Sequence, residues 1–210
     1  MPQLDSGVLI DLDGTLVDSV YYHVLAWHRA LRARGYEQAA ADIHAAIGMG
    51  SDRLLPWLLG DAVEDAGELA ADHTARFLDL ASDVRPTRGA TALLADLRER
   101  DVAHVVASSA SGDESATLLR ALDVEPPVID SESVAASKPA PDLLLAGCEQ
   151  LGTAPEHTIL IGDSPWDAEA ARRVGIAMIG VRTGGFSDGV LFRHGAHDVV
   201  ADPLALVGRL

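Results

Sequence analysis

The chain has 210 residues, of which 48% are hydrophobic, and a formal net charge of -16 at pH 7. This length suits one ordinary domain, or one domain that carries an insertion, and the hydrophobic fraction can fill a core. The acidic balance leaves no basic surface for the phosphates of a nucleic acid or for the anionic face of a membrane. We therefore expect neither partner.

A single cysteine, Cys148, cannot form an internal disulfide, so nothing points to an oxidising compartment. No apolar run approaches the ~20 residues that span a bilayer. We expect a cytoplasmic protein that is a monomer or a homodimer. If an acidic protein acts on an acidic substrate, its site needs a bound divalent cation or a few well-placed lysines.

Short apolar runs that end in a polar residue recur along the chain and predict buried parallel strands. They cover residues 8–10 before Asp11, 102–107 before Ser108, 158–161 before Gly162 and Asp163, and 177–181. Helical patterns lie between them, at residues 90–100, 114–122, 142–151 and 166–174. This alternation predicts an α/β fold, a doubly wound parallel sheet with helices on both faces. The ligand site of such a sheet lies outside the carboxyl ends of its strands.

The segment from residue 18 to residue 84 breaks this rhythm, because it has helical patterns and no strand pattern. Helical spacing relates Val20, Val24, Trp27 and Leu31, and residues 54–59 and 68–80 also look helical. We predict an inserted α-helical cap at residues 18–85. The core domain is then discontinuous, comprising residues 1–17 and 86–210.

The first strand runs directly into the most informative segment, in which Asp11 and Asp13 are followed by Gly14 and Thr15. Two carboxylates at this spacing can leave a strand end on a turn. One then faces the pocket as nucleophile or metal ligand, and the other reaches the leaving group. An isolated Asp-x-Asp is more often an acidic turn, so the interpretation depends on the accompanying motifs.

Three further polar groups follow predicted strands or a stiff loop. The hydroxyl of Ser108 can bind a phosphoryl oxygen together with the backbone N–H groups of Ser109 and Ala110, although such serines are usually turns or caps. Lys138 precedes two prolines, Pro139 and Pro141, which stiffen a loop where Asp142 can cap the next helix; a loop lysine is normally solvated. Asp163 is free to ligate a hard cation, and Asp167 could be only a first-turn helix acid.

Together, these four elements resemble the motifs of the haloacid dehalogenase-like (HAD) superfamily, and the resemblance covers essentially the whole chain. The inserted segment is similar to the C1-type cap of the β-phosphoglucomutase-like and phosphoglycolate-phosphatase-like subfamilies. The resemblance implies a Rossmann-like catalytic core and a phosphatase that acts on a small phosphorylated metabolite. The dehalogenases of this superfamily lack the second Asp, and its P-type ATPases carry Thr there.

The resemblance also implies the roles of the site residues. Asp11 would be the nucleophile and a ligand of Mg²⁺, and Asp13 the general acid/base, with its backbone carbonyl on the metal. Asp163 would be the third protein contact to the metal, and Asp167 would support the metal site from the same loop. Because Asp13 must carry a proton when the leaving alcohol departs, we expect its pKa to be raised.

The same resemblance implies that Ser108, Ser109 and Lys138 bind the phosphate group. One magnesium ion and one lysine are consistent with phosphoryl transfer, which needs in-line positioning and neutralisation of charge on the equatorial oxygens. All four motif elements are present, which argues against a non-catalytic binding module.

The cap would choose the leaving group, and its expected contacts are His23, Gly50, Ser51 and Arg53. His23 matches the β-phosphoglucomutase His that couples cap closure to acid/base catalysis, although a helical His near a Trp is often only packed. Arg53 could bind substrate or could simply be solvated. The mutase cap loop carries an Arg where this chain has Ser51, and no Lys occurs between Asp18 and Val84. The sequence therefore favours a phosphatase over a phosphosugar mutase, which is the alternative.

A receiver-like regulatory domain also combines an Asp cluster, a hydroxyl and a Lys on a doubly wound sheet. Its phosphorylated Asp follows a middle strand rather than the first strand, and it has no inserted helical cap. The sequence excludes it on both counts, and leaves the identity of the phosphorylated substrate open.

Overall fold

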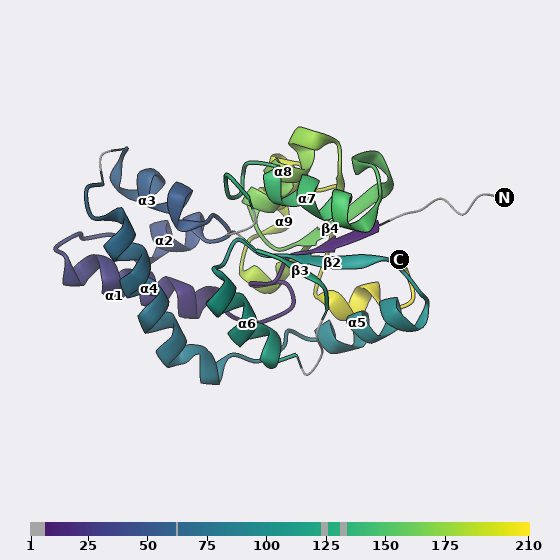
Figure 1. Ribbon diagram of the computed structural model, residues 1–210, viewed down its shortest axis with the longest axis horizontal. Helices are drawn as coiled ribbons and strands as arrows, with labels where there is room; N and C mark the ends of the chain where they lie inside the picture. The colour runs from purple at the N-terminus through teal and green to yellow at the C-terminus, as the bar shows by residue number, and fades with distance from the viewer. Residues whose placement is uncertain (1–6, 62, 123–125, 131–133) are drawn as a thin grey trace.

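A computed structural model describes residues 7–61, 63–122, 126–130 and 134–210 (Figure 1). The described residues form one six-stranded parallel sheet in the order β3-β2-β1-β4-β5-β6. Its strands are β1 (Gly7–Ile10), β2 (His104–Ala107), β3 (Val128–Ile129), β4 (Thr158–Gly162), β5 (Ala177–Val181) and β6 (Asp198–Val200). The predicted doubly wound parallel sheet is confirmed. Residues 1–6, which the sequence assigns to the same domain, lie outside the described residues.

The first strand occupies the middle of the sheet, with Leu9 paired to Val105 of β2 and to Leu160 of β4. Val8 and Ile10 belong to one hydrophobic cluster, and Leu9 belongs to a second. Successive side chains of a strand point to opposite faces, so the two clusters lie on opposite faces of the sheet. Because both faces are covered, this strand is apolar at every position.

Helices cover both faces of the sheet (Figure 1). One face packs against α5 (Ala90–Glu99) and α6 (Gly112–Arg120). The other packs against α7 (Asp142–Leu151), α8 (Pro165–Val174) and α9 (Asp188–His194). No helix of the described chain is long and apolar enough to cross a membrane.

Four helices form a separate body at one end of the sheet (Figure 1). They are α1 (Val20–Ala33), α2 (Ala40–Ala46), α3 (Ser51–Leu59) and α4 (Ala66–Leu80). Their apolar faces pack on one another in a third buried cluster, which includes Trp27 and Leu69. An amphipathic helix needs such a partner for its apolar stripe. These helices fill the segment where no strand was predicted.

The two connections between this body and the sheet lie side by side. The backbone N–H of Asp18 donates to the carbonyl of Arg85 at 2.9 Å, and Val17 forms a β-bridge with Pro86. An insertion that leaves and re-enters a domain at one point can fold around its own core. On this basis we propose residues 18–85 as the cap and the remaining described residues as the core.

The sequence did not predict several short elements, among them β3, β6, α2 and α9. The two strands lie at the edges of the sheet and contain only two and three residues, so they show no usable periodicity. The expected cap by Asp142 is wrong. Pro141 occupies the N-cap position of α7, and Asp142 is the first residue of the helix, where its charge favours the helix dipole.

Gly89, the N-cap residue of α5, has φ +86°, and a Cβ there would overlap the backbone of Leu204 in the turn η5 (Pro203–Leu206). Gly35 has φ +83° and nothing within 4 Å of such a Cβ. We predict that Gly35→Ala costs about 1–2 kcal/mol of unfolding free energy through backbone strain. Gly89→Ala should cost about 1–3 kcal/mol more through the overlap. Chemical denaturation measures both; equal costs would contradict the close packing of α5 on η5.

Candidate active site

Polar residues from three strands meet at the carboxyl edge of the sheet. Asp11 follows β1, Ser108 follows β2, and Asp163 follows β4. The sheet ladder continues into two of these positions, because the N–H of Asp11 donates to Ile161 at 2.9 Å and that of Ser108 donates to Ile129 at 2.9 Å. The predicted strand-end positions therefore come together, held by backbone hydrogen bonds.

Lys138 reaches this edge from the loop before α7, and its side chain is fully buried. Its Nζ lies 2.5 Å from Oδ1 of Asp11 and 2.8 Å from Oδ1 of Asp167. It also donates to the carbonyl of Ala107 at 3.0 Å. The sequence alternative of a solvated loop lysine does not hold. One ammonium group instead joins the strand end at Asp11 to the helix at Asp167.

Asp167 serves two partners at once. It is the third residue of α8, and its Oδ2 accepts hydrogen bonds from the backbone N–H of Ser164 at 3.1 Å and from its hydroxyl at 2.5 Å. The Ser164 hydroxyl in turn faces the N–H of Asp167, which completes a capping box. The second oxygen, Oδ1, lies against Lys138. Asp167 is therefore both a helix cap and the rigid anchor of the lysine.

Burial and neighbouring charges act on these groups in opposite directions. Burial raises the pKa of Asp11, Lys138 opposes this, and the Asp167 and Asp13 carboxylates add to it, which leaves the Asp11 pKa at about 7. Burial lowers the pKa of Lys138, but the Asp11 and Asp167 carboxylates outweigh it and raise that pKa overall. The lysine is thus charged at neutral pH, and the Asp11 carboxyl is poorly compensated by it alone.

Asp163 lies beside this pair. Ligand oxygens of Asp11, Asp163 and Asp167 all lie within 4.8 Å of one another. A Cβ at Gly14 or at Gly184 would collide with the Asp163 carboxylate, so the two glycines let the backbone close around it. Burial, then the Asp11 and Asp167 charges, raise the Asp163 pKa well above its usual range.

The donor chemistry of this cluster fits a hard divalent cation. Its three carboxylates and one ammonium group sum to a formal charge of -2 (−3 from Asp11, Asp163 and Asp167, +1 from Lys138). Carboxylate oxygens are the ligands that Mg²⁺ prefers. A cation among them would lower the raised pKa values of Asp11 and Asp163, because an adjacent opposite charge favours the ionised form.

Asp13, two residues after Asp11 in the chain, lies among hydrogen-bond donors. Its Oδ1 accepts from the hydroxyl of Ser19 at 2.5 Å and lies 2.9 Å from Nε2 of His23. Burial raises the Asp13 pKa, but the charge and hydrogen bond of His23, the Ser19 hydroxyl and the Lys138 charge together lower it. The expectation that the Asp13 pKa is raised is wrong, because helix α1 of the cap places His23 beside this carboxylate.

The proton of this pair therefore resides on the histidine. Burial lowers the pKa of His23, whereas the charge and hydrogen bond of Asp13, and the charges of Glu114 and Asp11, raise it above its ordinary value. Phe77 stacks on the ring at a centroid distance of 3.8 Å. His23 thus contacts the general acid/base candidate as expected, and it is also packed, which was the competing interpretation.

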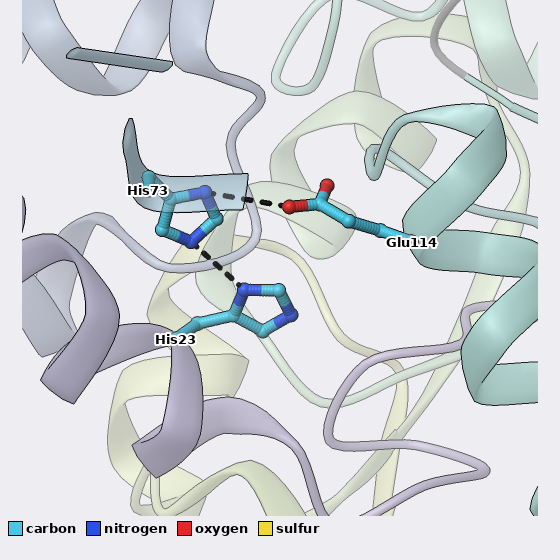
Figure 2. Close-up of side chains that lie close together, drawn as sticks. All are labelled: His23, His73 and Glu114. Atoms are coloured by element: carbon cyan, nitrogen blue, oxygen red, sulfur yellow. Dashed lines mark hydrogen bonds and ion pairs between the residues drawn. The ribbon is translucent and has the colours of Figure 1, made fainter. Parts of the chain in front are cut away.

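The contact chain continues across the cap and back to the core (Figure 2). His23 Nδ1 lies 3.1 Å from His73 Nε2 in α4, and His73 Nδ1 lies 3.4 Å from Glu114 Oε1 in α6. Burial and the charge of His23 lower the pKa of His73 well below its ordinary value, so this second ring is neutral. His73 uses a different nitrogen for each neighbour, which makes the group a chain rather than a converging ligand set.

A cavity of about 370 Å³ opens from Asp11 and Asp13 toward the cap, within the range of small-molecule sites, about 300–1,000 Å³. Its walls come from the cap helices, from the loop before α3, and from residues 109–111 and Glu114 of the core. Ser109 lines it, and the Ser109 hydroxyl is buried and makes no hydrogen bond within the described chain. Ser108 is fully buried, and its hydroxyl accepts from the N–H of Ala110 at 3.1 Å.

The predicted cap contacts divide into two groups. Gly50 and Ser51 line the cavity, and the N–H of Gly50 donates to the Ser137 hydroxyl at 3.0 Å, beside Lys138. Arg53 does not line it; its side chain is about half exposed, and its Nε lies 3.5 Å from Asp52 Oδ2. The solvated interpretation of Arg53 is the one the geometry favours.

Sequence reasoning missed His73 and Glu114, both of which line the cavity. One signal was available for the histidine: Leu69, His73 and Phe77 are the buried residues of α4, at a spacing of four. A histidine in the middle of an apolar helical stripe must find polar partners inside the protein. Nothing local marks Glu114, which reads as an ordinary capping-box acid three residues after Ser111.

The comparisons with known proteins agree with this architecture. The haloacid dehalogenase-like hydrolase family model matches residues 6–175, and the chain therefore belongs to that family. Hexitol phosphatase A of Escherichia coli K12 is 29% identical over 186 residues, which cover 83% of this chain and 82% of that protein. Phosphoglycolate phosphatase of Nitrosococcus oceani is 29% identical over 214 residues, which cover 97% and 95%.

A solved structure also matches closely. The crystal structure of a hydrolase from Pseudomonas syringae superposes with a TM-score of 0.93 at 34% sequence identity, covering 96% of this chain and 95% of that one. The resemblance inferred from the four motifs is confirmed.

The buried ion pair predicts a large effect on stability. Lys138→Met should lower the free energy of unfolding by about 3–5 kcal/mol in the presence of EDTA, because Asp11 and Asp167 lose their shared cation. Arg98→Met, at an exposed position of α5, is the matched control and should stay within about 0.5 kcal/mol of wild type. Urea denaturation at pH 7.5 measures both, and equal stabilities of the two variants would contradict the ion-pair assignment.

Proposed function

We propose that this chain, a HAD-type phosphatase, is a magnesium-dependent phosphomonoester hydrolase that forms an aspartyl-phosphate on Asp11. The observation that carries the proposal is the buried cluster of Asp11, Asp163 and Asp167 around a single ammonium group. Asp11 of this cluster lines a cavity of metabolite size, and so does Ser109, whose hydroxyl is unsatisfied. A divalent cation would compensate the negative charge of the cluster, and the Ser109 hydroxyl would donate to a phosphate oxygen.

Asp11 acts as the nucleophile. Its carboxylate attacks the phosphorus atom, a bond forms between the two, and the bond to the leaving alcohol breaks. Lys138 lies 2.5 Å from Asp11, where its charge offsets that of the incoming phosphoryl oxygens. Ser108 and Ser109 bind those oxygens through hydroxyl and backbone donors. Water then attacks the phosphorylated Asp11, which releases inorganic phosphate and restores the carboxylate.

Asp13 and His23 handle the proton together. The leaving alkoxide must gain a proton in the first step, and the attacking water must lose one in the second. Asp13 lines the cavity, and Nε2 of His23 lies 2.9 Å from its Oδ1, close enough to exchange a proton with it. Two groups so strongly coupled titrate as a unit. We therefore assign the general acid/base role to the pair, with Asp13 facing the reacting oxygen.

Asp11, Asp163 and the backbone carbonyl of Asp13 are the proposed ligands of Mg²⁺. When bound, the ion neutralises charge on the phosphoryl oxygens and orients the group for in-line attack. Asp167 supports this set indirectly, because its two oxygens hold Lys138 and the start of α8. Gly14 and Gly184 keep the Asp163 carboxylate in place.

Hydrolysis is favoured over the mutase reaction by the cavity. A mutase must hold a bisphosphate by its distal phosphate, and the described lining of this cavity contains neither lysine nor arginine. Ser51 lines it at the position of the mutase arginine. Relatives named hexitol phosphatase and phosphoglycolate phosphatase also support a phosphatase of small metabolites.

Metal removal should abolish turnover. We predict that excess EDTA stops phosphate release from a phosphomonoester and that added Mg²⁺ restores it. Asp163→Asn should raise the Mg²⁺ concentration needed for half-maximal activity by at least about 10–100-fold, since a ligand charge is lost. Asp79→Asn, at an exposed position of α4, should leave it unchanged. Full activity in excess EDTA would exclude the proposed metal site.

The reaction product distinguishes hydrolase from mutase. Incubation with β-glucose 1-phosphate and a trace of glucose 1,6-bisphosphate should release inorganic phosphate, or give no reaction if this sugar fits poorly. Asp11→Asn should be inactive, since the amide keeps the shape of the carboxylate and is no nucleophile. Formation of glucose 6-phosphate without phosphate release would instead assign the chain as a mutase. Near wild-type turnover by Asp11→Asn would require a different nucleophile.

A further inference from the structure

Glu114 lines the cavity, and one of its buried oxygens makes no hydrogen bond within the described chain. The residue is only 4% exposed and lines the cavity from helix α6 of the core. Its Oε2 accepts from the N–H of Ser111 at 3.2 Å and from the Ser111 hydroxyl at 3.1 Å. Its Oε1 makes no hydrogen bond within the described chain, although the neutral ring of His73 lies 3.4 Å away (Figure 2). A buried carboxylate oxygen without a donor is costly unless a ligand supplies one.

The cavity as a whole lacks lysine and arginine in its described lining, whose carboxylates are those of Asp11, Asp13, Asp52 and Glu114. The imidazole of His23 is paired with Asp13 at the phosphate end. Arg53 contacts Asp52 from outside the cavity. A carboxylate or second phosphate on the leaving group would therefore meet like charge with no compensating partner.

From these observations we infer the substrate class: the phosphate monoester of an uncharged polyol or sugar, with a leaving-group hydroxyl donating its hydrogen to Oε1 of Glu114. This inference rests on the proposed phosphatase function and assigns Glu114 as a specificity-determining residue. Hydroxyl groups supply the donor that the carboxylate lacks, and they bring no negative charge into an acidic cavity. His73 and Trp27 complete the wall, their rings stacked at a centroid distance of 4.1 Å.

The geometry of the histidines disfavours a second metal site in this place. His23, His73 and Glu114 have ligand atoms within 4.8 Å of one another. However, the Nε2 of His73 faces His23 and its Nδ1 faces Glu114 (Figure 2). One imidazole cannot direct both nitrogens at one ion. We infer that the Glu114 oxygen, which contacts His73 without a hydrogen bond, is left for a donor on the substrate.

The test compares two phosphate esters that differ in leaving-group charge. Wild-type enzyme with Mg²⁺ is assayed on sorbitol 6-phosphate and on 2-phosphoglycolate, with p-nitrophenyl phosphate as a general reporter of phosphatase activity. We expect kcat/KM for sorbitol 6-phosphate to exceed that for 2-phosphoglycolate by at least about 100-fold, because buried polar groups left unpaired penalise the wrong ligand.

Glu114→Gln separates recognition from folding. Glutamine at the third helical position still supports the capping box with Ser111, so the start of α6 is retained. The variant should lower kcat/KM for sorbitol 6-phosphate by about 10–100-fold, the usual value of a hydrogen bond to a charged group, mainly through KM. The value for 2-phosphoglycolate should fall less or rise, because a negative charge is removed. Glu149→Gln, exposed on α7, is the matched control.

Two results would overturn the inference while leaving the phosphatase intact. One is turnover of p-nitrophenyl phosphate by wild type with a preference for 2-phosphoglycolate over the hexitol ester. The other is an equal loss on both esters in Glu114→Gln, which would indicate a purely structural role. If no ester releases phosphate in the presence of Mg²⁺, the proposed function fails and the substrate assignment fails with it.

Discussion

One buried ammonium group organises the site. Lys138 lies between Asp11 and Asp167 with no exposed surface, and so ties the end of the central strand to the start of α8. Three buried carboxylates share a single ammonium group, so negative charge remains that no side chain of the cluster compensates. The cost of such burial is normally met by pairing or by a metal ion. A fold that retains this arrangement therefore holds a site ready for a cation and an anion together.

The cap and the core meet through polar contacts that surround this site. Ser137, next to Lys138 in the chain, bonds to Gly50 and to the Asp52 carboxylate of the cap. On the other side of the cavity, His73 of the cap lies against Glu114 of the core. The cavity is thus bounded by both bodies, and neither body alone contains the reacting groups and the leaving-group wall. The residues that would select the substrate and those that would transfer its phosphate line the same cavity.

The sequence predicts the parts of this site that follow directly from strand ends. An apolar run that stops at an acid or a hydroxyl places Asp11, Ser108 and Asp163 at one edge because parallel strands share their direction. The contacts of His73 and Glu114 depend instead on how α4 packs against α6, which no local pattern encodes. The same reason explains the Asp13 pKa: its direction is decided by a histidine that arrives from the cap.

Lys138 is also the only lysine among the 210 residues; the other fifteen of the sixteen basic side chains counted as Lys or Arg are arginines. Its amine is fully buried and held by two carboxylates, so the folded chain offers amine-directed reagents no lysine side chain. Acylating labels, aldehyde cross-linkers and amine-coupled surfaces therefore have no side-chain target while the protein stays folded. Reaction at this lysine would report that the core has opened, which makes the chain its own probe of unfolding.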